Sequence, residues 1–162
     1  MSSQQPTSIP APTAEQLAQA HHLIQQMRNE IGKVIIGQQV VIDQVLIGLF
    51  AAGHVLIEGV PGLGKTLLVR ALARSFSGQF GRIQFTPDLM PTDVTGHIIY
   101  DMQSEQFTLR KGPVFTHLLL ADEINRAPAK TQSALLEVMQ EGQVTLEGKA
   151  LEVPRPFMTL AT

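Results

Sequence analysis

The chain has 162 residues, 44% hydrophobic and 16% charged, and this apolar content can fill one core of ordinary domain size. Its formal net charge of −2 argues against a broad basic face for nucleic acid, since phosphate neutralisation needs clustered Lys and Arg. The absence of cysteine excludes disulfides and thiolate metal sites and fits a cytoplasmic protein.

The N-terminal third is predicted to contain a tail and two helices. Residues 1–12 are rich in Ser, Gln, Thr and Pro, so we expect a disordered tail. Thr13 and Gln16 have the spacing of a capping box, which predicts a helix to about Ile31. A second helix fits residues 38–52, where apolar residues recur at helical spacing. Polar residues interrupt the apolar stretch there, and a membrane-spanning helix needs roughly 20 apolar residues, so no membrane span is predicted.

Strands and helices alternate from residue 54 onward. Short apolar runs predict four buried strands, at residues 54–58, 82–85, 117–121 and 157–161. Helical patterns between them predict helices at residues 65–77 and 128–140. This order implies an α/β fold with a mostly parallel sheet covered by helices on both faces.

Two segments depart from this alternation. Residues 98–101 and 106–109 resemble the arms of one β-hairpin, and residues 143–146 and 151–153 those of another, around Gly148. Both hairpins would be insertions on the α/β core.

A glycine-rich loop follows the first predicted strand and opens a helix, the context required of a phosphate-binding loop. It consists of Gly59, Val60, Pro61, Gly62, Leu63, Gly64, Lys65 and Thr66, and the helix continues with Leu67. Glycines let backbone N–H groups turn toward phosphate oxygens, and the helix dipole adds to the attraction. Lys65 is expected to reach the β- and γ-phosphates of a nucleotide, and the Thr66 hydroxyl to bind Mg²⁺.

An acidic pair follows the third predicted strand. Asp122 and Glu123 end the apolar run Leu118-Leu119-Leu120-Ala121, at the carboxyl edge where ligands bind in open α/β sheets. We expect Asp122 to hold the Mg²⁺ shell and Glu123 to deprotonate the attacking water. The two motifs together predict Mg²⁺-dependent ATP hydrolysis, with Lys65 and Glu123 as the catalytic side chains.

Two other classes of P-loop protein are distinguished from this chain by their own sequence motifs. The chain lacks the Asn-Lys-x-Asp of small GTPases and the Ser-Gly-Gly signature of ABC-type ATPases. Two alternatives stay open at this point. One is a P-loop phosphotransferase acting on a small acceptor, and the other is a nucleotide-binding interaction module without significant turnover.

Longer strings around these motifs resemble the MoxR family of AAA+ ATPases, over about residues 31–162. Besides the loop, they are FTPDLMPTDVTG (85–96), GPVF (112–115), ADEINRAP (121–128) and QSALLE (132–137). The resemblance implies a P-loop core of the AAA+ type that assembles as a ring, usually a hexamer, and remodels or matures client proteins. It also implies a possible partner with a von Willebrand factor A domain, and it places Ile36, Gly37 and Gln38 against the adenine.

The family pattern continues past Thr162 with the first sensor, the fifth strand, the arginine finger and the helical lid. Residues 13–162 are therefore expected to be the N-terminal portion of the core without its lid, with the loop-bearing strand at a sheet edge. ATP turnover by this chain alone is expected to be slow. Arg126 fits either an intersubunit contact or a surface arginine at a helix start.

Overall fold

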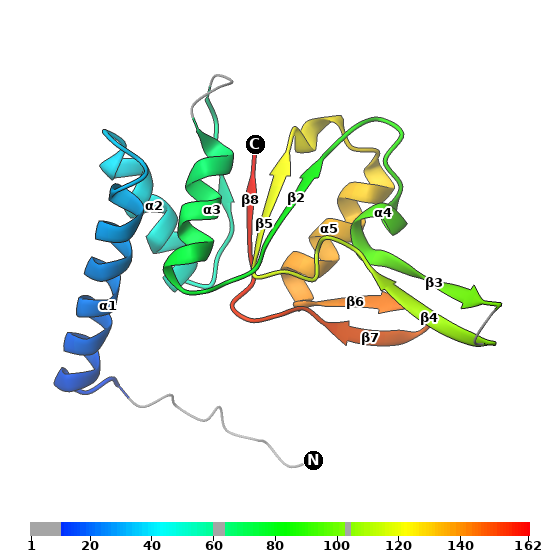
Figure 1. The fold of residues 1–162 in the computed structure, drawn as a ribbon, viewed down its shortest axis with the longest axis horizontal. Helices are drawn as coiled ribbons and strands as arrows, with labels where there is room; N and C mark the ends of the chain where they lie inside the picture. Colours follow the sequence, from blue (N-terminus) through cyan, green and yellow to red (C-terminus); the bar gives the residue numbers. More distant parts are fainter. Residues whose placement is uncertain (1–10, 60–63, 103–104) are drawn as a thin grey trace, which may run out of the picture.

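The computed structural model describes residues 11–59, 64–102 and 105–162 (Figure 1). Most of the predicted tail, residues 1–10, lies outside the described residues. The central element is a parallel sheet in the order β1-β8-β5-β2. Its strands are β1 (Val55–Leu56), β2 (Phe80–Gln84), β5 (Leu118–Asp122) and β8 (Met158–Ala161). The parallel α/β core is thus confirmed, and β1 lies at an edge of this sheet, as expected.

Helices cover both faces of the sheet, with α1, α2 and α3 on one side and α5 on the other (Figure 1). Their bounds are α1 (Ala14–Gly32), α2 (Gln39–Phe50), α3 (Lys65–Ser75) and α5 (Ala129–Glu141). The predicted capping box starts α1: the Gln16 N–H donates to Thr13 Oγ1 at 3.2 Å, and the Thr13 N–H donates to Gln16 Oε1 at 2.8 Å.

Strand β5 runs through the middle of this three-layer arrangement, and its side chains alternate between two cores. Leu118 and Leu120 join the apolar side chains of α1, α2 and α3. Leu119 and Ala121 join those of α5 on the opposite face. All four are fully buried, so β5 is held from both sides and its carboxyl end is fixed in position.

Both predicted hairpins form, and they extend to the same end of the molecule (Figure 1). The first pairs β3 (Gly96–Asp101) with β4 (Gln106–Lys111), and the second pairs β6 (Gln143–Leu146) with β7 (Lys149–Glu152). In the second turn Glu147 and Gly148 both have positive φ, 48° and 74°. That pair of conformations closes two-residue hairpins, and it explains why β7 begins two residues before the prediction.

Two short elements were not predicted: α4 (Pro91–Thr95) and the 3₁₀ turn η1 (Ile124–Arg126). The predicted strand at 82–85 lies instead at Phe80–Gln84, because Phe80 and Gly81 pair with Leu118 and Leu119. The second helix is also shorter than 38–52, since it ends at Phe50.

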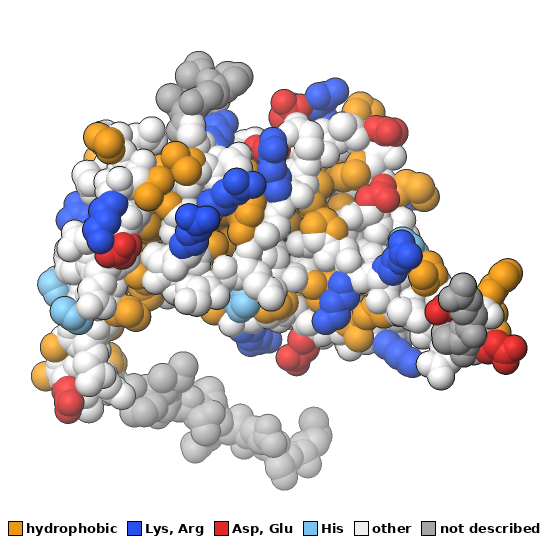
Figure 2. Space-filling view, viewed as in Figure 1, with side chains coloured by type: hydrophobic (Ala, Val, Ile, Leu, Met, Phe, Trp, Pro, Cys, Tyr) orange, Lys and Arg blue, Asp and Glu red, His pale blue; other side chains and the backbone are white. Residues whose placement is uncertain are grey.

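Charged side chains of both signs are spread over the face in Figure 2, and Lys and Arg gather over α3 and the adjacent part of the sheet. Within the described ranges, every helix is too short or too polar to cross a membrane.

Candidate active site

The carboxyl ends of β1, β5 and β8 meet at one edge of the sheet, beside the start of α3. Because all strands are parallel, this is the edge where open α/β sheets bind ligands. A cavity of about 650 Å³ opens there. It is lined by Gly59, Gly64, Lys65, Thr66, Leu67, Arg82, Gln84, Asp122, Glu123, Asn125 and Thr162. The structure therefore brings the described part of the predicted loop and the predicted acidic pair to one cavity.

The described part of the loop is shaped for phosphate. Gly64 has φ 72° and ψ 21°, a left-handed conformation that glycine adopts without a Cβ penalty, and it is the N-cap of α3. Lys65 is the first residue of α3, and its Nζ donates to the carbonyl oxygen of Gly59 at 3.3 Å. The N–H groups of the first helical turn have no acceptor within the helix itself, and they point toward the same end. The predicted phosphate contacts of Val60, Pro61, Gly62 and Leu63 lie outside the described residues.

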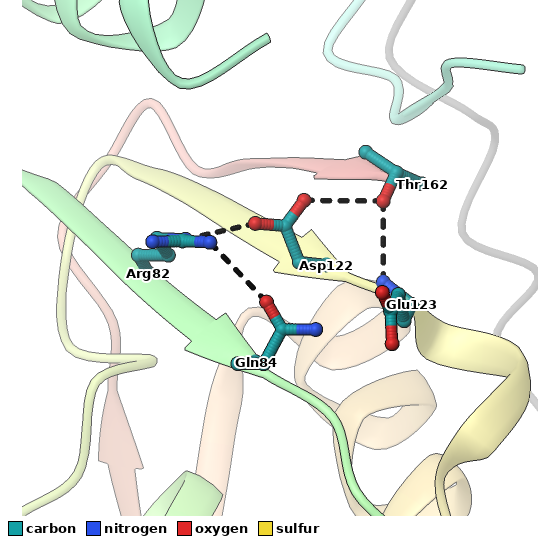
Figure 3. A network of polar contacts seen from close by, with 5 residues as sticks. All are labelled: Arg82, Gln84, Asp122, Glu123 and Thr162. Carbon is teal, nitrogen blue, oxygen red and sulfur yellow. Dashed lines mark hydrogen bonds and ion pairs between the residues drawn. The ribbon is translucent and has the colours of Figure 1, made fainter. Parts of the chain in front are cut away.

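Asp122 is the last residue of β5 and is held from both neighbouring strands (Figure 3). Arg82 of β2 donates from Nε to Asp122 Oδ2 at 2.8 Å, and the Thr162 hydroxyl donates to Asp122 Oδ1 at 3.1 Å. The Asp122 side chain is only 14% exposed, whereas that of Arg82 is 49% exposed. Both carboxylate oxygens thus have partners, and the side chain is fixed at the cavity wall.

Glu123 leaves the strand at a sharp turn. Its backbone is left-handed, with φ 55° and ψ 47°, which is uncommon for a residue with a Cβ. The Glu123 N–H donates to Thr162 Oγ1 at 3.1 Å, which anchors the turn to the end of β8. The side chain is half exposed, and Glu123 Oε2 accepts from Arg126 Nη1 at 2.8 Å. Arg126, left open between two roles by the sequence, is therefore a partner of the predicted water-activating acid.

The sequence patterns did not identify Arg82 and Gln84 as residues of the site. Arg82 Nη2 donates to Gln84 Oε1 at 3.2 Å, so both side chains belong to the network around Asp122 (Figure 3). The signal available was the alternation Arg82-Ile83-Gln84, which puts two polar side chains on one face of a strand. That this face meets Asp122 follows only from the register of β2 against β5, in which Gln84 pairs with Asp122.

The donor set at the cavity fits Mg²⁺. Thr66 and Asp122 supply a hydroxyl and a carboxylate, and Mg²⁺ binds oxygen ligands, usually one or two carboxylates together with substrate phosphates. Ile36, Gly37 and Gln38 lie elsewhere, at the turn between α1 and α2, and are absent from the cavity lining. Their predicted contact with adenine stays a prediction.

Comparison with known proteins yields a consistent set of relatives. A family model described as "ATPase family associated with various cellular activities (AAA)" matches residues 54–162. Chaperone MoxR1 of Mycobacterium tuberculosis is 52% identical over 149 residues, which cover 92% of this chain and 40% of that protein. Protein MoxR of Methylorubrum extorquens is 36% identical over 130 residues, covering 77% and 38% respectively.

A solved crystal structure is also similar to this chain. A proposed ATPase from Cytophaga hutchinsonii superimposes with a TM-score of 0.74 and 49% identity, over 90% of this chain and 46% of that one. The chain thus spans less than half the length of these relatives.

Proposed function

Because this chain belongs to the AAA ATPase family and is similar to MoxR proteins over most of its length, we propose that it binds ATP with Mg²⁺ and hydrolyses it. The observation that carries the proposal is that the two motifs share one cavity at the sheet edge. Lys65 and Thr66 line it from the start of α3, and Asp122 and Glu123 line it from the end of β5. Residues separated by more than fifty positions in the chain thus supply phosphate-binding and acidic groups to one space.

Phosphate binding is assigned to the start of α3. The Lys65 ammonium neutralises phosphate charge, and exchanges its 3.3 Å contact with the Gly59 carbonyl for phosphate oxygens. Backbone N–H groups at the helix N-terminus add donors that need no reorganisation. Thr66 and Asp122 are the residues that would hold Mg²⁺, which, when bound, neutralises charge that develops on the phosphates.

Glu123 is assigned to the attacking water. A carboxylate that serves as a general base must reach the water, and the half-exposed Glu123 side chain lines the cavity from the turn after β5. The Arg126 ion pair holds it in one orientation, and a Glu123 that contacts water must loosen that pair. Asn125 lines the same cavity and is a further polar group available to the water.

We also propose the wider role that the resemblance implies. The protein assembles as a ring, a hexamer by analogy with AAA+ proteins, and uses ATP turnover to remodel or mature client proteins. The name of the M. tuberculosis relative, a chaperone, supports this role. A partner with a von Willebrand factor A domain and a cytoplasmic location belong to the same proposal.

Binding and turnover are tested separately. Equilibrium binding of a fluorescent ATP analogue is measured for the wild-type chain, for Lys65→Ala and for Lys149→Ala, a control on the exposed β7 hairpin strand. We expect loss of binding only with Lys65→Ala. Phosphate release is then measured for the wild-type chain, where slow turnover is expected, and for Glu123→Gln, which should bind the nucleotide with wild-type affinity and release no phosphate. Wild-type binding by Lys65→Ala, or full turnover by Glu123→Gln, would refute the assignment.

A further inference from the structure

The side chains that line the cavity carry equal numbers of positive and negative charges. Lys65 and Arg82 are cationic, and Asp122 and Glu123 are anionic, so their formal charges sum to zero. Arg82 is the member of this set that neither the phosphate loop nor the acidic pair explains. It is also the cation nearest to the carboxylate assigned to the metal, with its Nε at 2.8 Å from Asp122 Oδ2.

The environment of Asp122 explains why a cation is needed there. Its side chain is 14% exposed, and a carboxylate withdrawn from water is costly unless it is paired and hydrogen-bonded. The Thr162 hydroxyl is neutral and supplies only a hydrogen bond to Oδ1. Arg82 therefore supplies the compensating charge, and Gln84 Oε1 holds its guanidinium by accepting from Nη2 at 3.2 Å.

We propose that Arg82 is a built-in counter-ion of Asp122 that keeps the nucleotide-free cavity from binding a divalent cation, so that the metal enters together with the nucleotide phosphates. The inference rests on the proposed function, in which Asp122 holds Mg²⁺. The half-exposed guanidinium repels a second cation at the same carboxylate. Nucleotide phosphates bring negative charge that outweighs this repulsion. Arg82 is thus a positioning residue for the metal step and does not act on the reacting atoms.

The test measures metal binding without nucleotide or turnover. Mn²⁺ is titrated into the nucleotide-free chain, and bound Mn²⁺ is followed by electron paramagnetic resonance. Arg82→Gln removes the charge and keeps a hydrogen-bonding side chain, whereas Arg82→Lys keeps the charge. We expect Arg82→Gln to bind Mn²⁺ roughly three- to tenfold more tightly than wild type, because one repelling charge beside a divalent ion is lost in a solvent-screened site. Arg82→Lys should match wild type.

The double variant Arg82→Gln with Asp122→Asn tests whether the additional Mn²⁺ binds at Asp122. If it does, the double variant should bind Mn²⁺ no more tightly than the wild-type chain. Unchanged or weaker Mn²⁺ binding by Arg82→Gln overturns the proposal, and so does tight binding that survives in the double variant. Circular dichroism spectra of each variant verify folding. Failure of the proposed function has a different signature, namely no nucleotide binding by the wild-type chain whatever the Mn²⁺ result.

Discussion

Backbone strain at Glu123 makes a quantitative prediction about stability. At φ 55° and ψ 47°, a side chain with a Cβ costs roughly 1–2 kcal/mol relative to the right-handed region, and glycine does not bear this cost. Glycine loses more chain entropy on folding than alanine, by roughly 0.4–1 kcal/mol. Both Glu123→Ala and Glu123→Gly lose the exposed Arg126 ion pair, so that loss cancels in their comparison. Glu123→Gly should therefore be more stable than Glu123→Ala by about 1 kcal/mol.

Glu137 is the matched control, because it is exposed in the middle of α5 and has ordinary helical geometry. There, alanine should be more stable than glycine by about 1 kcal/mol, so the sign of the alanine–glycine difference reverses between the two positions. The free energy of unfolding of all four variants is measured by urea denaturation, followed by far-ultraviolet circular dichroism. In a thermal melt the same 1 kcal/mol corresponds to a shift of roughly 2–4 °C in melting temperature. If alanine is the more stable residue at both positions, Glu123 stores no strain and the reasoning fails.

Three further substitutions test the site and its support. Thr162→Val removes the hydroxyl that donates to Asp122, so the free energy of unfolding should fall by about 1 kcal/mol and ATP turnover should decrease. Unchanged turnover would contradict the role of this hydrogen bond. Gly112→Ala places a Cβ against backbone atoms of α4 and should cost about 1–3 kcal/mol, whereas Gly53→Ala has room and should be tolerated, as thermal melts will show. Leu120→Ala empties a fully buried position in the central strand and should cost about 2–5 kcal/mol in urea denaturation; a smaller loss would mean that the core collapses around it.

The parts of the fold that the sequence predicts are those with strong local signals. The apolar run ending at Asp122 has the length and composition of a buried strand, and Gly64 before Lys65 marks the start of a helix in both sequence and structure. Helix α4 (Pro91–Thr95) is too short to show a helical period, although its start carries a signal: the Asp93 carboxylate accepts from the Met90 N–H at 2.8 Å. Proline at its first position is the other half of that signal.

The network around Asp122 is less predictable, because it depends on register between distant strands. Arg82 and Asp122 are separated by forty residues, and their contact requires β2 to pair with β5 in one of several possible alignments. The pattern around Arg82 indicates an exposed strand face, but it contains no information about which neighbour that face meets. The same limit applies to Thr162, whose hydroxyl reaches Asp122 only because β8 lies next to β5.

The two acidic residues differ because the strand ends between them. Asp122 still belongs to the sheet: its carbonyl oxygen accepts from the Phe85 N–H at 2.9 Å, and its carboxylate is held from β2 and β8. Glu123 has already turned away, and its carboxylate has only Arg126, three residues later, as an ion-pair partner in the described chain. Both roles need a carboxylate in a defined position, and the two side chains obtain it differently: Asp122 is held from two neighbouring strands, and Glu123 by an ion pair on its own turn. The end of β5 thus supplies two adjacent carboxylates with different support, and the proposed function assigns the metal to the first and the attacking water to the second.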